Sequence, residues 1–89
     1  MLILKVVEYL ARISDNTGLI GEIVTLLTQL DEINSNTSLT STQKMEKSVK
    51  VRESLANKAK EYSRVLNSAN NETTGHQAMV KSMQIIAAN

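Results

Sequence analysis

The sequence contains no cysteine, proline, tryptophan or phenylalanine, and it has only three glycines. Without cysteine the chain has no disulfide framework, no thiolate nucleophile and no cysteine-ligated zinc site. Without proline it lacks the residue that most strongly interrupts a helix. The only aromatic residues are Tyr9 and Tyr62. These absences favour long helices and exclude a disulfide-stabilised fold.

Hydrophobic residues recur at helical spacing along the whole chain, and no segment alternates with the period of two that a half-buried strand requires. The clearest loop is "NSNTSLTST", residues 34–42, because Ser, Thr and Asn side chains compete for backbone hydrogen bonds. Thr40 with Gln43, and Thr74 with Gln77, have the spacing of capping boxes that open helices. The sequence predicts one all-α domain over residues 1–89, with helices at about 2–14, 19–33, 42–69 and 76–88.

Two polar clusters, around residues 15–18 and 70–75, leave two architectures open. Seam positions recur at alternating intervals of four and three residues, and this periodicity stays in phase through both clusters. A continuous coiled-coil helix requires such unbroken phase. However, Asp, Asn, Thr and Gly in succession cost roughly 2–3 kcal/mol relative to alanine inside a helix. The chain therefore forms either a small helical bundle with breaks at both clusters or a long helical hairpin. Propensity favours the bundle.

The first third of the chain is rich in apolar residues and acidic. Eighteen of residues 1–33 are apolar, and this part holds two basic against five acidic residues. Residues 40–89 hold eight basic against four acidic residues, so an acidic part is expected to fold against a basic part. A chain of this length buries roughly 60–65% of its unfolded surface. We therefore expect a second copy or a partner helix to cover part of the first third.

The start of the chain, "MLILKVVEYLARI", is apolar but is interrupted by Lys5, Glu8 and Arg12. It is too short to span a bilayer, and it lacks the basic leader and small-residue cleavage site of a signal peptide. As a surface helix it has too few basic residues to favour a membrane. We expect neither a membrane span nor a membrane-surface partner, and the sequence assigns no compartment.

The sequence contains few residues in patterns suited to catalysis or metal binding. His76 is the only histidine, and Glu72 is the only carboxylate near it, whereas a zinc site normally takes three or four ligands. No serine lies in a nucleophile elbow. Gly18 and Gly21 belong to "GLIG", which lacks the rest of any phosphate-binding fingerprint. We predict a protein that is not an enzyme and that needs no cofactor or metal.

A cluster of polar residues, then Thr74, Gly75, Gln77 and Ala78 in the pattern T-G-x-x-Q-A, precedes an apolar helix with Met79, Met83 and Ile86. In this order residues 55–89 resemble the late helical region of the minor-pilin family of type IV secretion and conjugation machines. The resemblance implies an elongated helical protein that binds other components of a pilus or channel. This chain is shorter than the usual members of that family.

The leading hypothesis is a non-enzymatic assembly or interaction protein that packs apolar helix faces on itself or on a partner, as a component of a secretion or conjugation machine or of a virion. The alternative is a small regulator or inhibitor that binds and occludes a target protein. A helix bundle that binds nucleic acid through Lys47, Lys50, Arg52 and Lys58 is disfavoured because glutamates alternate with these residues. The predicted interface residues are Leu10, Ile13, Ile20, Val24, Leu27, Leu30, Val80, Met83 and Ile86.

A docking end of Val80, Met83 and Ile86 is predicted within this set, and Leu55, Tyr62 and Leu66 are predicted to pack opposite the first third. Methionines and paired isoleucines form adaptable binding surfaces. In the hairpin architecture the last part of the chain overhangs, so replacing Met83 by Glu should dissolve an assembly and leave the helices intact. The residues considered for this surface are Met45, Met79, Met83, Ile85 and Ile86.

Overall fold

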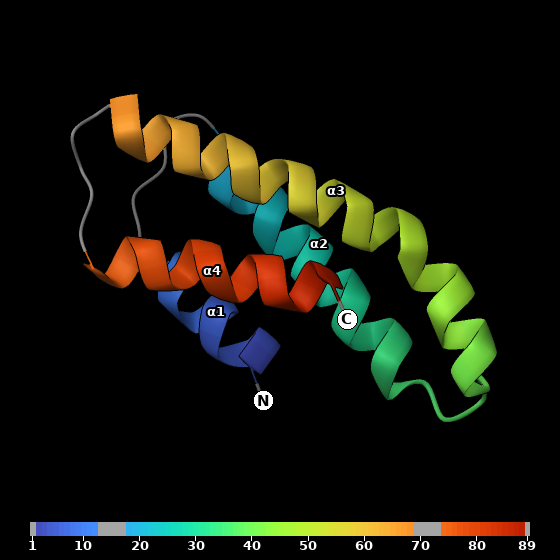
Figure 1. Ribbon diagram of the computed structural model, residues 1–89. Helices are drawn as coiled ribbons and strands as arrows, with labels where there is room; N and C mark the ends of the chain where they lie inside the picture. The colour runs from blue at the N-terminus through green and yellow to red at the C-terminus, as the bar shows by residue number, and fades with distance from the viewer. Residues whose placement is uncertain (1, 13–17, 69–73, 89) are drawn as a thin grey trace.

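The computed structural model describes residues 2–12, 18–68 and 74–88, with the side chains of all of these except residues 65–68 and 74–76. It contains four helices and, within the described residues, no strand. The chain is thus a small all-α bundle, as the sequence predicted, and it has the broken rather than the hairpin architecture (Figure 1). The helices are α1 (Leu2–Ala11), α2 (Leu19–Ser35), α3 (Ser41–Ser68) and α4 (Thr74–Ala88).

The helices pack as a ring, in which α1 contacts α2, α2 contacts α3, α3 contacts α4 and α4 contacts α1. The molecule is elongated, with extents of 44 × 21 × 20 Å. In Figure 1 the end of α2, the start of α3 and the loop between them extend beyond both ends of the chain. We call residues 31–48 the tip. The bundle therefore has a four-helix body and a two-helix tip.

The helix boundaries differ from the predicted ones for local reasons. The polar loop is shorter than predicted and spans residues 36–40, because α2 continues to Ser35 and α3 already begins at Ser41. The loop is closed by the Asn36 side chain, whose Oδ1 accepts a hydrogen bond from the Ser38 amide at 2.9 Å. The helix α1 ends at Ala11, and α4 begins at Thr74 rather than at residue 76.

The capping box at the start of α3 is confirmed. The Thr40 amide donates a hydrogen bond to Gln43 Oε1 at 2.9 Å, and the Gln43 amide donates one to Thr40 Oγ1 at 3.2 Å. Two backbone N–H groups near the helix start, which have no partner within the helix, are satisfied in this way. Such a cap stabilises a helix by about 1 kcal/mol, so it fixes where the tip turns.

The start of α2 depends on a glycine. Gly18 is the N-cap residue of α2 and has a positive φ of 78°, a left-handed conformation that costs other L-residues about 1–2 kcal/mol. Its carbonyl accepts a hydrogen bond from the Glu22 amide at 3.1 Å. This conformation is incompatible with a continuous helix at residue 18.

Replacing Gly18 by alanine should destabilise the fold by about 1–2 kcal/mol, because alanine is strained at this φ. Gly21 is the matched control, since it lies inside α2 and a Cβ there meets no atom within 4 Å. Gly21→Ala should stabilise the fold by up to about 1 kcal/mol. Urea unfolding of the two variants measures both effects, and a Gly18→Ala variant as stable as wild type would contradict the assignment.

The core is one cluster to which all four helices contribute. Apolar residues of the first third that were expected to need another chain are covered by the chain's own helices. The surplus of apolar residues in the first third therefore does not by itself require a partner. The buried apolar residues are Ile3, Val6, Leu10, Leu19, Ile20, Ile23, Leu27, Leu30, Leu55, Ala59, Tyr62, Val80, Met83 and Ile86.

Candidate interaction surface

Most of the predicted interface residues lie inside the bundle. Val24 is partly buried against the core, and Ile13 lies outside the described residues. In this conformation a partner cannot reach the buried residues, because the chain's own helices cover them. Of the residues predicted to pack opposite, Leu55 and Tyr62 are buried, while the Leu66 side chain lies outside the described part. The buried members of the predicted set are Leu10, Ile20, Leu27, Leu30, Val80, Met83 and Ile86.

Other large apolar side chains are exposed. Met45 is 65% exposed and Val49 is 40% exposed, and because they are four residues apart they share one face of α3. Ile85 is 47% exposed on α4, and Leu2 is 41% exposed at the start of α1. Leu4 is also exposed, at 50%, but it does not line the cavity described next.

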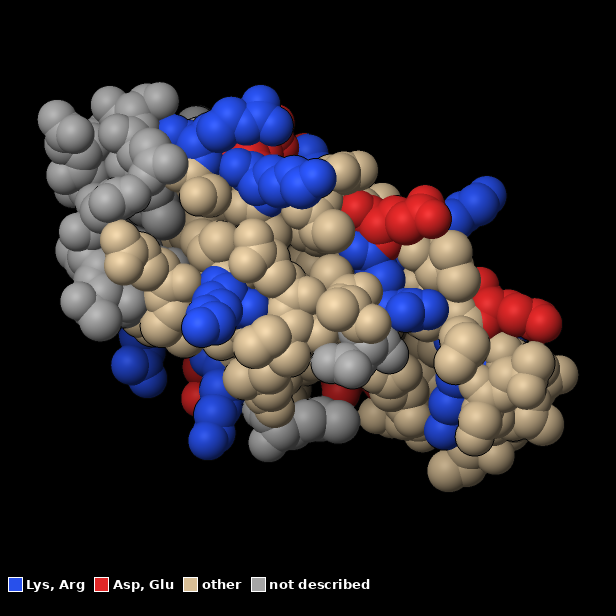
Figure 2. Space-filling model, viewed as in Figure 1, with Lys and Arg blue, Asp and Glu red and all other residues tan. Residues whose placement is uncertain are grey.

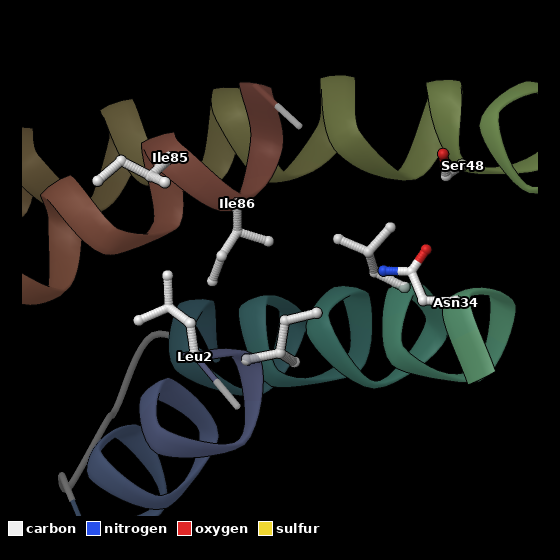
Figure 3. Close-up of a pocket in the computed structure, with 7 residues that line it drawn as sticks. Leu2, Asn34, Ser48, Ile85 and Ile86 are labelled. Carbon is white, nitrogen blue, oxygen red and sulfur yellow. The ribbon is translucent and has the colours of Figure 1, made fainter. Parts of the chain in front are cut away.

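An open cavity lies where α1 and α4 stop short of the tip. Its volume is about 230 Å³, and we call it the notch. In Figure 3, Leu2, Ile85 and Ile86 lie on one side of the notch, and Asn34 and Ser48 lie on the other. All four helices thus contribute to it. The lining residues are Leu2, Ile3, Leu30, Asn34, Ser48, Ile85 and Ile86.

The polar wall of the notch is built around Ser48, which is only 4% exposed. The Ser48 hydroxyl donates to the Met45 carbonyl oxygen at 3.0 Å and accepts a hydrogen bond from Arg52 Nε at 3.1 Å. A second nitrogen of the same guanidinium, Nη2, lies 3.4 Å from the Met45 oxygen. Arg52 is therefore held along α3, against Ser48 and the Met45 carbonyl.

The four exposed side chains Leu2, Met45, Val49 and Ile85 belong to this end of the molecule. Leu2 and Ile85 line the notch, and Met45 and Val49 flank Ser48 along α3. We call these four residues the apolar rim. The docking surface considered from the sequence combined Met45 and Ile85, which are exposed, with Met83 and Ile86, which are buried, because spacing alone does not show where a neighbouring helix ends. Met45 and Val49 are exposed because α1 and α4 end before they reach the start of α3.

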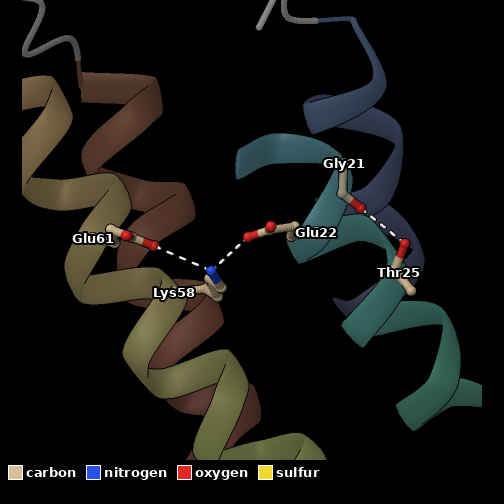
Figure 4. A network of polar contacts seen from close by, with 5 residues as sticks. All are labelled: Gly21, Glu22, Thr25, Lys58 and Glu61. Atoms are coloured by element: carbon tan, nitrogen blue, oxygen red, sulfur yellow. Dashed lines mark hydrogen bonds and ion pairs between the residues drawn. The ribbon is translucent and has the colours of Figure 1, made fainter. Parts of the chain in front are cut away.

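A charged cluster joins α2 to α3 away from the rim. Lys58 Nζ forms an ion pair with Glu22 at 2.5 Å and a longer one with Glu61 at 3.4 Å, so it lies between the two carboxylates (Figure 4). The pKa of Lys58 is raised above its ordinary value of 10.5, chiefly by the hydrogen bond to Glu22. The ion pair between Lys58 and Glu22 therefore links α3 to α2.

A shallow hollow of about 660 Å³ lies beside this cluster. Its floor includes Gly18 and Gly21, and the Thr25 hydroxyl donates to the Gly21 carbonyl oxygen at 2.9 Å (Figure 4). The hollow is open and lined mainly by small or polar residues. No group of three or more His, Asp or Glu side chains in the described part of the chain is arranged to hold a metal ion.

Removing Glu22 should lower stability slightly at neutral pH and not at strongly alkaline pH. Because the pKa of Lys58 is raised on folding, the ion pair stabilises the fold fully below pH 10.5, and its contribution is lost as the pH rises through the raised pKa. Thermal unfolding of Glu22→Gln and wild type at both pH values measures this difference. Glu32→Gln is the matched control on α2. A difference that persists unchanged at alkaline pH would contradict the ion pair.

The basic residues of α3 do not form a surface of one sign. Figure 2 shows blue and red side chains interspersed on the face it presents. Lys58 is paired with Glu22, and Arg52 is hydrogen-bonded to Ser48. Such a mixed surface is not typical of a nucleic-acid interface. Glu72, the proposed neighbour of His76, lies outside the described residues, and so does the His76 side chain.

No described helix has both the length and the apolar character that a membrane span requires. Comparison with known proteins gives no match, whether with family models, with curated proteins or with solved structures. The functional assignment therefore depends on the surface of this chain alone.

Proposed function

We propose that this protein is a non-enzymatic helical interaction protein that binds another protein, or a second copy of itself, through the apolar rim. The supporting observation is that Leu2, Met45, Val49 and Ile85 are exposed at one end of the bundle. Scattered single apolar residues on a surface need no explanation, but a group of them beside a cavity is typical of an interaction site. Arg52 lies beside the rim, where its guanidinium contacts Ser48 and the Met45 carbonyl.

Association should be tested by sedimentation from micromolar to millimolar protein. Val49→Glu places a charge in the rim and should abolish binding or self-association, while circular dichroism stays unchanged because Val49 is 40% exposed. Leu4→Glu is the matched control, since Leu4 is equally exposed but lies outside the rim. If Val49→Glu associates exactly as Leu4→Glu does, the rim is not the interface.

The closed core favours a second candidate, a small regulator that binds a target protein as a monomer. All four helices share one core, so the fold needs no second copy. This candidate uses the same rim and differs in its partner. Wild-type protein that stays monomeric at millimolar concentration would favour the regulator, whereas a dimer or larger species that Val49→Glu dissociates would favour assembly.

A role in a secretion or conjugation machine, or in a virion, belongs to the assembly form of this proposal. The similarity of residues 55–89 to minor pilins supports it, and there the apolar end of α4 would meet other components. Ile85 is the exposed large apolar residue among the described residues of that end. Cross-linking from position 85 within such an assembly, with position 4 as control, would test this placement.

A further inference from the structure

The exposed face at the start of α3 carries a short pattern that is complementary to itself. Met45 and Val49 are exposed apolar residues, and each is followed by an exposed charged residue, Glu46 and Lys50 respectively. The two apolar–charged pairs have the same order and charges of opposite sign. In Figure 1 this part of α3 lies at the end of the molecule that extends beyond both chain ends, so another protein can reach it.

The two charges in this pattern have no ion-pair partner within the described part of the chain. Glu46 and Lys50 are four residues apart on one helix and could reach each other, but the structure does not pair them. Both side chains are exposed. They are therefore available to a partner that supplies a positive charge at one position and a negative charge at the other.

The end of the molecule that carries this pattern has charges of both signs. Lys44 and Lys47 lie on either side of Glu46 along α3, and the end of α2 carries Asp31 and Glu32. One carboxylate oxygen of Asp31 is buried and has no hydrogen-bond partner, so this end does not favour an acidic ligand. A partner of a single charge sign would meet like charges on part of the surface, which disfavours the complex. A second copy of the chain brings both signs.

A two-fold axis would satisfy the pattern twice. In a two-fold symmetric interface, each contact from one copy to the other is repeated in the reverse direction. If two copies of α3 pack antiparallel about an axis between residues 47 and 48, Met45 faces Val49 of the second copy to within one residue. Glu46 then faces Lys50 of the second copy in the same way. A parallel arrangement would instead bring Glu46 onto its own equivalent.

We propose that the partner bound at the rim is a second copy of this chain, docked antiparallel along the start of α3. Met45 packs against Val49 of the second copy, and Glu46 pairs with Lys50 of the second copy. This inference rests on the proposed function, in which the rim is a binding surface, and it adds the partner and its orientation. Ion pairs between exposed residues contribute little affinity, so the apolar contacts hold the dimer and the charges select the orientation.

Charge reversal tests this orientation by sedimentation at low ionic strength, where surface charges are least screened. Wild type should dimerise between micromolar and millimolar concentration. Glu46→Lys and Lys50→Glu should each weaken the dimer by about fivefold or more, because each creates two contacts between like charges. An equimolar mixture of the two variants should dimerise as tightly as wild type, since every contact between them again joins opposite charges.

Matched controls make the same charge changes elsewhere. Glu8→Lys on α1 and Lys60→Glu on α3 alter exposed residues outside the rim and should leave the dimer unchanged. Because all four positions are exposed, every variant should fold, which circular dichroism verifies. A mixture that dimerises no more tightly than the single variants would overturn the antiparallel pairing. Wild type that stays monomeric at millimolar concentration would overturn the second copy as the partner.

The failure of this inference can be distinguished from the failure of the proposed function. A dimer that Val49→Glu abolishes, but that neither charge reversal weakens, would overturn the orientation and support the rim as the binding surface. A dimer that Val49→Glu leaves unchanged would contradict the proposed function and this inference together.

Discussion

Replacing Met83 by glutamate is expected to unfold the bundle. Met83 has no exposed surface and belongs to the core. A carboxylate at this position would lose its hydration without gaining a partner, which costs several kcal/mol, and the contacts of the methionine would be lost as well. Domains are stabilised by only about 5–15 kcal/mol in total. Loss of the helical circular dichroism signal at ambient temperature measures the effect.

Two control variants distinguish loss of the fold from loss of association. Met83→Leu keeps an apolar side chain of similar volume and should cost less than about 1.5 kcal/mol. Ile85→Glu introduces the same charge two residues along α4 but at an exposed position, so the fold should persist. If Met83→Glu kept its helices and lost only association, position 83 would be part of an intermolecular docking end after all, as the sequence pattern alone suggested.

Replacing Leu27 by alanine should lower the free energy of unfolding by about 2–5 kcal/mol. Leu27 is fully buried in α2 and belongs to the core cluster to which all four helices contribute. The loss combines the transfer free energy of the removed carbons with the cavity they leave. In a domain of this size such a loss corresponds to a fall in Tm on the order of 10–30 °C.

Leu4→Ala is the matched comparison, because the chemical change is the same while Leu4 is half exposed on α1. Its effect should stay within about 0.5 kcal/mol. Differential scanning calorimetry of both variants gives the two values directly. Comparable losses at positions 4 and 27 would mean that Leu4 is covered in solution, contrary to its exposure here.

The start of α3 could be predicted from sequence because its signal is local. Thr40 and Gln43 satisfy each other's backbone groups whatever the rest of the chain does. The break before α2 was harder to predict, since the apolar spacing continues through it. Its decisive feature is the left-handed conformation of Gly18, and glycine in a sequence permits that conformation without requiring it.

The candidate surface could be predicted only in part. Periodicity identified the stripe of Val80, Met83 and Ile86 correctly as apolar and helical, but it does not say whether the covering helix comes from the same chain. Ile85 is adjacent in sequence to Ile86, yet its side chain is 47% exposed whereas that of Ile86 is buried. The notch depends on the relative lengths of four helices, which no local pattern encodes.

The two-helix construction of the tip also determines where the native structure opens most readily. Helical amides there are protected by the pair α2 and α3 alone, whereas the stretch of α3 around Leu55 and Ala59 is buried in the four-helix body. Segments with fewer buried apolar contacts open at lower free energy. Amide hydrogens of residues 45–47 should therefore exchange with deuterium well before those of residues 55–62, so the end of the molecule that carries the rim is also its most readily reshaped part.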